Sequence, residues 1–399
     1  PDGGGPFAGL VAGKNEEFYG TTFAGGNTPS GGLGTVFEIS SAGKEKVLYS
    51  FQGGNDGLAP QAGLIVDSAG NLYGDTAYGG GSTTCTDGCG AVFEVSKKGA
   101  GYKEHVLYAF QGGKDGQSPI GTLLADKSGS LYGTTNNGGS GTKCTPGSGF
   151  TGCGTVYKLT RSGSSYTEKV LYAFSGGKDG AFPKTALIAD DKGQLYGTTY
   201  MGGTGQACTG GCGVVFKLSP KGTRYTETVL HDFQGGTNDG NYPRAALLGV
   251  AGGDLIGATT RGAGSGPGGG TVYELVRAGT HYTERLLYVF TDAYTQGAVP
   301  DDEDGLYMDA AGHLYGTTIA GGSAGSGCGS GPCGTVFMLT SSKSGSYSGT
   351  VLHSFQGGND GAVPRASLAA DAKGTLYSTT ESGGTGPSGG YGVVFKVAP

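Results

Sequence analysis

Four consecutive acidic residues follow Pro300 and form the most concentrated group of chemically active side chains in the sequence. They are Asp301, Asp302, Glu303 and Asp304, in a connection two residues longer than its counterparts elsewhere in the chain. Carboxylate oxygens are the ligands that Ca²⁺ prefers, so Asp301, Asp302 and Asp304 could hold calcium. A carboxylate pair among Asp301, Asp302 and Glu303 could instead perform the acid–base chemistry of glycoside hydrolysis. A solvated acidic loop without chemistry is the alternative, and no other motif requires a cofactor.

A second group of candidates occupies positions that vary between otherwise recurring stretches. One position follows a recurring proline, and the other follows a recurring Thr-Thr pair. Aromatic, amide and charged side chains gathered around one opening could bind a polar ligand such as a glycan. The predicted ligand-binding residues are Tyr78, Asn136, Asn137, Lys184, Tyr200, Arg244, Arg261, Arg365 and Glu381. The alternative is that exposed loop positions vary freely.

The eight cysteines fall in four close pairs within glycine-rich stretches: Cys85 and Cys89, Cys144 and Cys153, Cys208 and Cys212, and Cys328 and Cys333. The even count and the local spacing predict four disulfides. A zinc site would need four converging ligands, and no histidine lies in these stretches. Disulfides persist in oxidising compartments, which predicts a secreted, extracellular or cell-surface protein.

Other kinds of chemistry find little support. The five histidines are His105, His231, His281, His313 and His353, and they are expected in outer strands or tight turns, away from the candidate loops. We therefore expect no Ser-His-Asp triad. A net charge of −6 without a basic run argues against nucleic acid as a partner. No apolar stretch approaches the roughly 20 residues that span a bilayer.

The elements that position these residues recur along the chain. The string Leu-Tyr-Gly-Thr-Thr, or a close variant, occurs seven times at intervals of 54 to 64 residues. A string like Gly-Thr-Val-Phe follows it each time, and Val-Leu-Tyr-x-Phe occurs six times. These runs are short, rich in Val, Tyr, Phe and Thr, and separated by Gly, Asp, Ser and Pro, as is typical of strands. The 88 glycines and 15 prolines are therefore turn residues rather than a sign of disorder.

The repeats predict an all-β fold, a seven-bladed β-propeller with four-stranded antiparallel blades. The chain is expected to form a single domain over residues 1–399, with blades at about 1–52, 53–111, 112–175, 176–234, 235–291, 292–356 and 357–399. The Gly-Gly-x-Asp-Gly connections between blades and the long loops after the second strands should share one face. The recurring Asp of these connections is expected to form turns rather than bind calcium. All of the binding candidates fall on this loop-rich face, around the mouth of the central channel.

The count of outer strands leaves one blade incomplete. The Val-Leu-Tyr-x-Phe string is missing from the seventh repeat, so the last blade is expected to lack its outer strand within this chain. Residues 1–3 match the end of a Gly-Gly-x-Asp-Gly connection, so we expect such a string upstream of Pro1 in the precursor. The unpaired edge could alternatively be completed by another chain, which makes self-association through blade seven a possible mode of assembly.

The combined pattern Leu-Tyr-Gly-Thr-Thr-x-x-Gly-Gly, Gly-Thr-Val-Phe and Val-Leu-Tyr-x-Phe-x-Gly-Gly-x-Asp-Gly resembles the GloVer-type tandem repeat. That family occurs in exported bacterial proteins. The resemblance covers essentially the whole chain and implies export and a propeller-like fold, but it implies little about activity.

Three functions are compatible with these observations. The first is an exported binding or surface-structural module that recognises a glycan or another extracellular polymer through the loop-rich face. Tyrosine would have to replace tryptophan for stacking, since the chain has no Trp. The second is a polysaccharide-active enzyme, a hydrolase or a lyase, which would use residues 301–304 together with Tyr200, Arg244 and Arg261. The third is a self-assembling extracellular structural protein.

Overall fold

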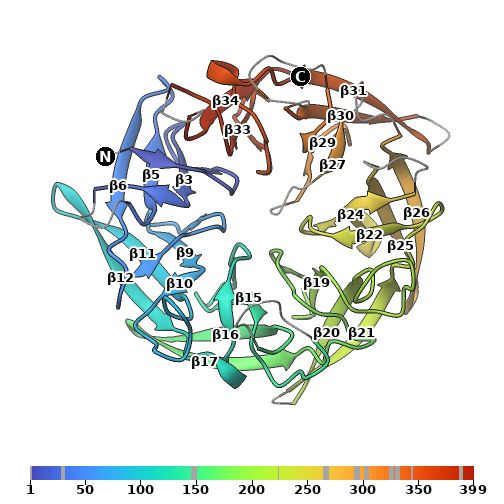
Figure 1. Ribbon diagram of the computed structural model, residues 1–399, viewed down its shortest axis with the longest axis horizontal. Helices are drawn as coiled ribbons and strands as arrows, with labels where there is room; N and C mark the ends of the chain where they lie inside the picture. Colours follow the sequence, from blue (N-terminus) through green and yellow to red (C-terminus); the bar gives the residue numbers. More distant parts are fainter. Residues whose placement is uncertain are drawn as a thin grey trace.

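Seven small antiparallel sheets stand in a ring in the computed structural model, which confirms the all-β propeller (Figure 1). The structure describes residues 2–27, 32–144, 151–222, 224–263, 269–291, 297–300, 305–322, 328, 333–342, 345–385 and 390–399. The only helical segments among them are three short 3₁₀ turns, η1 (Gly113–Asp115), η2 (Ala251–Gly253) and η3 (Gly358–Asp360). None of the described helices is long and apolar enough to cross a membrane.

Blades one to six each contain four antiparallel strands ordered from the centre outwards. Blade one has β2 (Val11–Ala12), β3 (Phe18–Thr22), β5 (Thr35–Ile39) and β6 (Glu45–Ser50). Blade two has β8 (Ile65–Val66), β9 (Leu72–Thr76), β11 (Ala91–Lys98) and β12 (Gly101–Ala109). Blade three has β14 (Leu124–Ala125), β15 (Leu131–Asn137), β16 (Thr155–Ser162) and β17 (Ser165–Ala173).

The second half of the ring repeats this order. Blade four has β18 (Ile188–Ala189), β19 (Leu195–Thr199), β20 (Val214–Lys221) and β21 (Arg224–Asp232). Blade five has β23 (Leu248–Gly249), β24 (Leu255–Gly262), β25 (Thr271–Ala278) and β26 (His281–Val289). Blade six has β28 (Tyr307–Met308), β29 (Leu314–Ala320), β30 (Thr335–Ser341) and β31 (Tyr347–Ser354). Blade seven has three described strands, β32 (Ala369–Ala370), β33 (Leu376–Thr380) and β34 (Val393–Val397).

The innermost strand is interrupted, which the sequence patterns do not predict. Five blades have a short additional strand on the loop-rich side, before the two-residue innermost strand. In three of these blades the additional strand and the innermost strand pair with the same second strand. These additional strands are β1 (Gly3–Gly4) with β4 (Ala24–Gly25), β7 (Gly57–Leu58) with β10 (Tyr78–Gly79), β13 (Gln117–Pro119), β22 (Gly240–Pro243) and β27 (Ala298–Pro300). The interruption follows the recurring proline, which has no N–H to continue the ladder.

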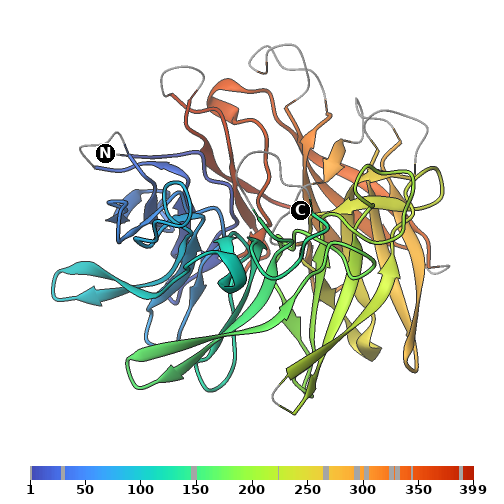
Figure 2. The ribbon, with the colours of Figure 1, turned by 60° about the horizontal axis from the view of Figure 1, so that its bottom comes forward.

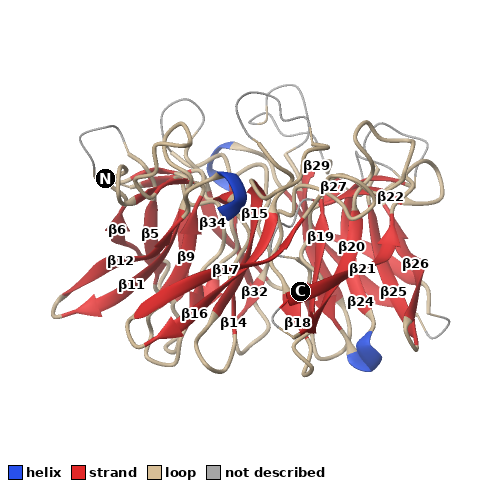
Figure 3. Cartoon of the chain, turned by 90° about the horizontal axis from the view of Figure 1, so that it is seen from below, coloured by secondary structure: helices blue, strands red, loops and turns tan. Residues whose placement is uncertain are grey.

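The two kinds of long connection share one face, as predicted. The N–H of Gly139, in the loop after β15, donates to the carbonyl of Gly113, in the connection into blade three, at 2.8 Å. Gly203 and Gly177 make the equivalent bond in blade four at 2.9 Å. The long loops gather along one side in Figure 3, and Figure 2 shows the hairpins of the two outer strands projecting on the opposite side.

The core between blades is built from pairs of aromatic rings. The phenylalanine directly after an outer strand packs edge-on against an aromatic ring of the next blade, with centroids 5.0 to 5.2 Å apart. The six pairs are Phe51–Phe93, Phe110–Tyr157, Phe174–Phe216, Phe233–Tyr273, Phe290–Phe337 and Phe355–Phe395. The recurring Leu-Tyr-Gly glycine makes room for these rings: a Cβ on Gly74 would lie 2.7 Å from the Phe93 ring.

The two ends of the chain meet and close the ring, and among the described residues no outer strand follows β34 in the sheet of blade seven. The Thr379 hydroxyl donates to the Ala8 carbonyl at 3.2 Å, and the Phe18 ring stacks on Tyr377 at 4.5 Å. Outside these contacts, β34 presents an open edge on which Val394 is 36% exposed. A groove of about 530 Å³ lies beside this edge, and Phe37 and Glu45 of blade one line its opposite wall.

Candidate functional site

Four side chains of blades four and five form a cluster of cations and aromatic rings at the inner rim of the loop-rich face. The Lys184 ammonium lies 4.7 Å from the centre of the Tyr200 ring, and the Arg244 guanidinium lies 5.8 Å from it. Tyr200 stacks on Tyr242, with centroids 5.0 Å apart and an interplanar angle of 28°. We call these four residues the inner-rim cluster. All four are half-buried, so rings and charges are held in place while part of each stays accessible.

Tyr242 is positioned by an unusual backbone conformation. It precedes the recurring proline and has a φ of 57°, in the left-handed region that non-glycine residues rarely adopt. The same position in other blades is equally left-handed, at Ala59, Ser118, Phe182, Val299 and Val363. Such a residue costs about 1–3 kcal/mol and persists only where its surroundings hold it. Tyr242 is not among the predicted ligand-binding residues, although its variable position just before a recurring proline is a signal that could indicate it.

A carbonyl of the preceding blade supplies that restraint, from a disulfide cysteine at Ser118, Phe182, Tyr242 and Val363 and from Leu33 at Ala59. All four predicted disulfides form, at Cys85–Cys89, Cys144–Cys153, Cys208–Cys212 and Cys328–Cys333. The N–H of Tyr242 donates to the carbonyl of Cys212, in the preceding blade, at 2.8 Å. Phe182 donates in the same way to Cys153 at 2.8 Å. A disulfide in one blade thus anchors the inner rim of the next.

Two other predicted residues pair with each other. Arg365 Nε donates to Glu381 Oε2 at 2.5 Å, and both side chains are about three-quarters buried. The Arg365 guanidinium also lies 6.0 Å from the centre of the Phe7 ring. This part of the rim carries a neutralised pair rather than a concentration of charge.

The remaining predicted residues lie around the same face but join no common cluster. Arg261 is exposed, and its backbone pairs with that of Asn241. Burial raises the pKa of Tyr242, and the nearby charge of Arg261 opposes that rise. Tyr78 pairs with Leu58 in blade two, and Asn137 is buried in blade three. The Asn136 side-chain oxygen is also buried. The ring therefore distributes these side chains over several blades.

The acidic candidates cannot be placed. Asp301, Asp302, Glu303 and Asp304 lie outside the described residues, so the calcium site and the catalytic carboxylates stay predictions. The same holds for part of the neighbouring loop of blade five, residues 264–268.

A repeated polar contact ties each outer strand to the connection that follows it. The Tyr108 hydroxyl donates to Asp115 at 2.8 Å, and the Gln111 N–H donates to the other carboxylate oxygen at 2.6 Å. Equivalent tyrosine contacts join Tyr49 to Asp56 and Tyr172 to Asp179. A half-buried glutamate of the next outer strand lies near each aspartate, at Glu104, Glu168 and Glu227.

Histidine replaces this tyrosine twice. His353 Nε2 lies 3.0 Å from Asp360, and His231 Nε2 lies 3.3 Å from Asp239. Both histidines lie in outer strands, as predicted, but near the strand ends, where the imidazole reaches the connection on the loop-rich face as a tyrosine hydroxyl does. Burial disfavours the charged imidazole of His231, but its carboxylate neighbours outweigh burial and raise the pKa.

Comparison with known proteins bears on the fold and the family. The profile of the Gloeobacter/Verrucomicrobia repeat matches residues 1–145 and 142–395. A search of proteins with curated function finds no match. A Bacteroides uniformis protein assigned as a 6-phosphogluconolactonase shares 13% identity, with a TM-score of 0.54 over 92% of this chain and 89% of that one. A Lactobacillus plantarum protein shares 10% identity, with a TM-score of 0.51 over 92% and 94%. At these identities the structural likeness shows the fold alone.

Proposed function

The chain belongs to the Gloeobacter/Verrucomicrobia repeat family, and we propose that this member is an exported module that binds an anionic glycan or a similar extracellular polymer. The observation that carries the proposal is the inner-rim cluster, in which Lys184 and Arg244 flank one tyrosine ring. The four disulfides support export, because such bonds persist in oxidising compartments.

The chemistry of the cluster favours an acidic sugar over a neutral one. Tyrosine rings offer flat apolar surfaces on which a sugar ring can lie. Lysine and arginine beside those rings would attract a carboxylate or sulfate group, and arginine can bind it through two parallel hydrogen bonds. Arg261, exposed in the same blade as Arg244, extends the positive surface.

A panel of soluble polysaccharides tests the proposal. Alginate, pectate and chondroitin sulfate represent acidic chains, and dextran and laminarin represent neutral ones. We expect saturable binding of an acidic chain and a loss of at least tenfold in affinity in Arg244→Ala. Lys192→Ala is the matched control, because Lys192 is an exposed cation in a tight turn on the opposite face. Equal loss in both variants, or binding to none of the polymers, would overturn the proposal.

The enzyme alternative is tested in the same panel. Release of new reducing ends or unsaturated products that Asp301→Asn or Asp302→Asn abolishes would establish a hydrolase or a lyase. Retention of the polymer without turnover would favour the binding module.

The third candidate, assembly through the open edge of blade seven, draws support from the exposed β34 and the adjacent groove. An apparent mass that rises with protein concentration in size-exclusion chromatography would support it.

A further inference from the structure

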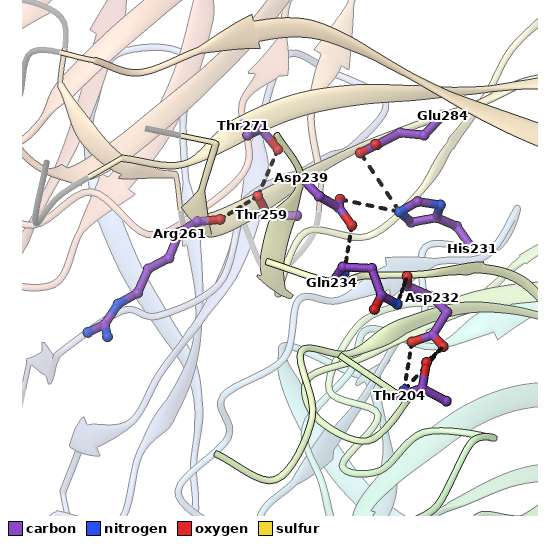
Figure 4. A network of polar contacts seen from close by, with 9 residues as sticks. All are labelled: Thr204, His231, Asp232, Gln234, Asp239, Thr259, Arg261, Thr271 and Glu284. Atoms are coloured by element: carbon purple, nitrogen blue, oxygen red, sulfur yellow. Dashed lines mark hydrogen bonds and ion pairs between the residues drawn. The ribbon is translucent and has the colours of Figure 1, made fainter. Parts of the chain in front are cut away.

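One junction between neighbouring blades combines an imidazole with two carboxylates. His231 lies near the end of β21 in blade four, Asp239 lies in the connection into blade five, and Glu284 lies in β26 of blade five. His231 Nε2 is 3.3 Å from Asp239 Oδ1 and 3.9 Å from Glu284 Oε1. One ligand atom of each residue lies within 4.8 Å of the others, and Figure 4 shows both carboxylates facing the imidazole nitrogen.

The junction is held in place by its surroundings. The Gln234 N–H donates to Asp239 Oδ2 at 2.6 Å, and the His231 ring packs edge-on against Phe233 with centroids 4.5 Å apart. The side chains of His231, Asp239 and Glu284 are only 19%, 13% and 13% exposed. The three ligand atoms are therefore positioned before any ion arrives.

Glu284 brings a second carboxylate to this junction. Its Oε1 atom is buried without a hydrogen-bond donor among the described residues, as are the same atoms of Glu104, Glu168 and Glu227 at the preceding junctions, so the histidine is what distinguishes this junction. A buried carboxylate beside a second carboxylate is costly unless a proton or a cation neutralises it. Glu284 Oε1 lies 3.9 Å from the His231 nitrogen, which is also a metal ligand, and the Glu284 carboxyl lies close to that of Asp239.

We propose that His231, Asp239 and Glu284 form a binding site for a divalent transition metal of the Zn²⁺ type. One imidazole nitrogen and two carboxylate oxygens are a donor set that suits zinc and its neighbours, with a remaining position for water. Tetrahedral ligands at about 2.0–2.1 Å from zinc lie about 3.3 Å apart, which the His231–Asp239 pair already matches. A bound ion would join blades four and five, since the ligands come from both.

The other junctions explain why this one is distinctive. In the preceding junction, the Tyr172 hydroxyl donates to Asp179, and a phenol is a poor ligand for these ions. In blade six, His353 contacts Asp360, but no outer strand of blade seven is described that could supply a glutamate. Within the described part of the chain, His231, Asp239 and Glu284 are the one group of three or more His, Cys, Asp or Glu side chains that lie close enough together to hold a metal ion.

Metal binding to the chelator-treated protein tests the proposal. Isothermal titration with Zn²⁺, and the visible absorption of added Co²⁺, should both report one equivalent. His231→Tyr restores the residue found in blades one to three, so it should fold normally and lose binding by at least a hundredfold. Glu284→Gln should lose at least tenfold, while His353→Tyr should retain full affinity.

A gain-of-site variant completes the test. Tyr172→His places an imidazole beside Asp179 and Glu227 and should raise the stoichiometry to two. The inference is overturned if the native protein binds no Zn²⁺ at 100 µM, or if His231→Tyr binds as tightly as the native protein. Zn²⁺ should also raise the melting temperature of the native protein and leave that of His231→Tyr unchanged.

Discussion

The ring of Phe355 packs edge-on against the ring of Phe395, 5.0 Å away, and this is the last of the six edge-on pairs that join an outer strand to the next blade. The next pair would need a phenylalanine from an outer strand of blade seven to meet Phe37 of blade one. Phe37 instead lines the groove beside the open edge of β34. The groove between blades seven and one could therefore accommodate an outer strand of blade seven, which the described residues do not include.

We predict that a peptide with the sequence of residues 168–174 binds this groove. It carries the outer-strand pattern, so its backbone can pair with β34 and its final phenylalanine can occupy the space beside Phe37. Binding should be saturable by fluorescence anisotropy and should raise the melting temperature by a few degrees. Replacing the final phenylalanine by alanine should weaken binding at least tenfold, and equal binding of a scrambled peptide would contradict the prediction.

Arg244 and Arg365 should differ in their contribution to polymer binding. Arg365 pairs with Glu381 in blade seven, and Arg244 lies with Lys184 beside a tyrosine ring that can stack on a sugar. Arg244→Ala should weaken binding of an acidic polymer at least tenfold, and Arg365→Ala by less than threefold. Biolayer interferometry at two salt concentrations checks this, because salt screens charges and the electrostatic contribution to binding affinity should shrink as the salt concentration rises. A larger effect at Arg365 would move the binding site to blade seven.

Loss of the Cys208–Cys212 disulfide should reduce both stability and binding. A loop this short contributes about 2 kcal/mol to the free energy of unfolding. The Cys212 carbonyl also accepts the hydrogen bond that holds Tyr242, so the double serine variant should weaken polymer binding several-fold. The double serine variant of Cys85 and Cys89, which have the same sequence separation, is the matched control for stability.

Removal of the control disulfide, Cys85–Cys89, should affect stability without affecting the binding site. The Cys89 carbonyl anchors Ser118, which lies outside the inner-rim cluster. Its removal should lower the free energy of unfolding in denaturant by a similar amount and leave binding intact. Equal loss of binding in both variants would show that the disulfides act only through overall stability.

Stability should fall as the pH rises from about 5 to 8. Burial, followed by the charge of Asp115, raises the pKa of Glu168 to about 7, and Glu104 and Glu227 behave similarly. The folded state holds these protons more tightly than the unfolded chain does, where a glutamate has a pKa of about 4.3. Their stabilising contribution is therefore complete below about pH 4.3 and is lost as the pH passes through 7.

Glu168→Gln tests this dependence, because glutamine resembles the protonated acid. Melting temperatures measured by circular dichroism should decline less steeply with pH in the variant, by roughly 1–2 °C over this interval. Identical slopes in the two proteins would show that Glu168 does not hold a proton in the fold.

Much of the fold is predictable from the sequence because its repeats satisfy local rules. Alternating apolar residues favour strands, and Asp-Gly and Gly-Gly pairs favour the turns between them, so the number and order of the blades follow from the chain. The four disulfides are equally local, since each pair is closed within a single loop. The three described strands of blade seven agree with the same count, because only six outer-strand strings occur in 399 residues.

The tertiary structure decided which side chains meet. Lys184 and Tyr242 lie in different blades, and only the curvature of the ring brings both to Tyr200, as it brings His231 to Glu284. The left-handed conformation of Tyr242 likewise depends on a carbonyl from the preceding blade. Local propensities determine strands and turns, whereas contacts between blades depend on the angle and spacing at which whole sheets pack.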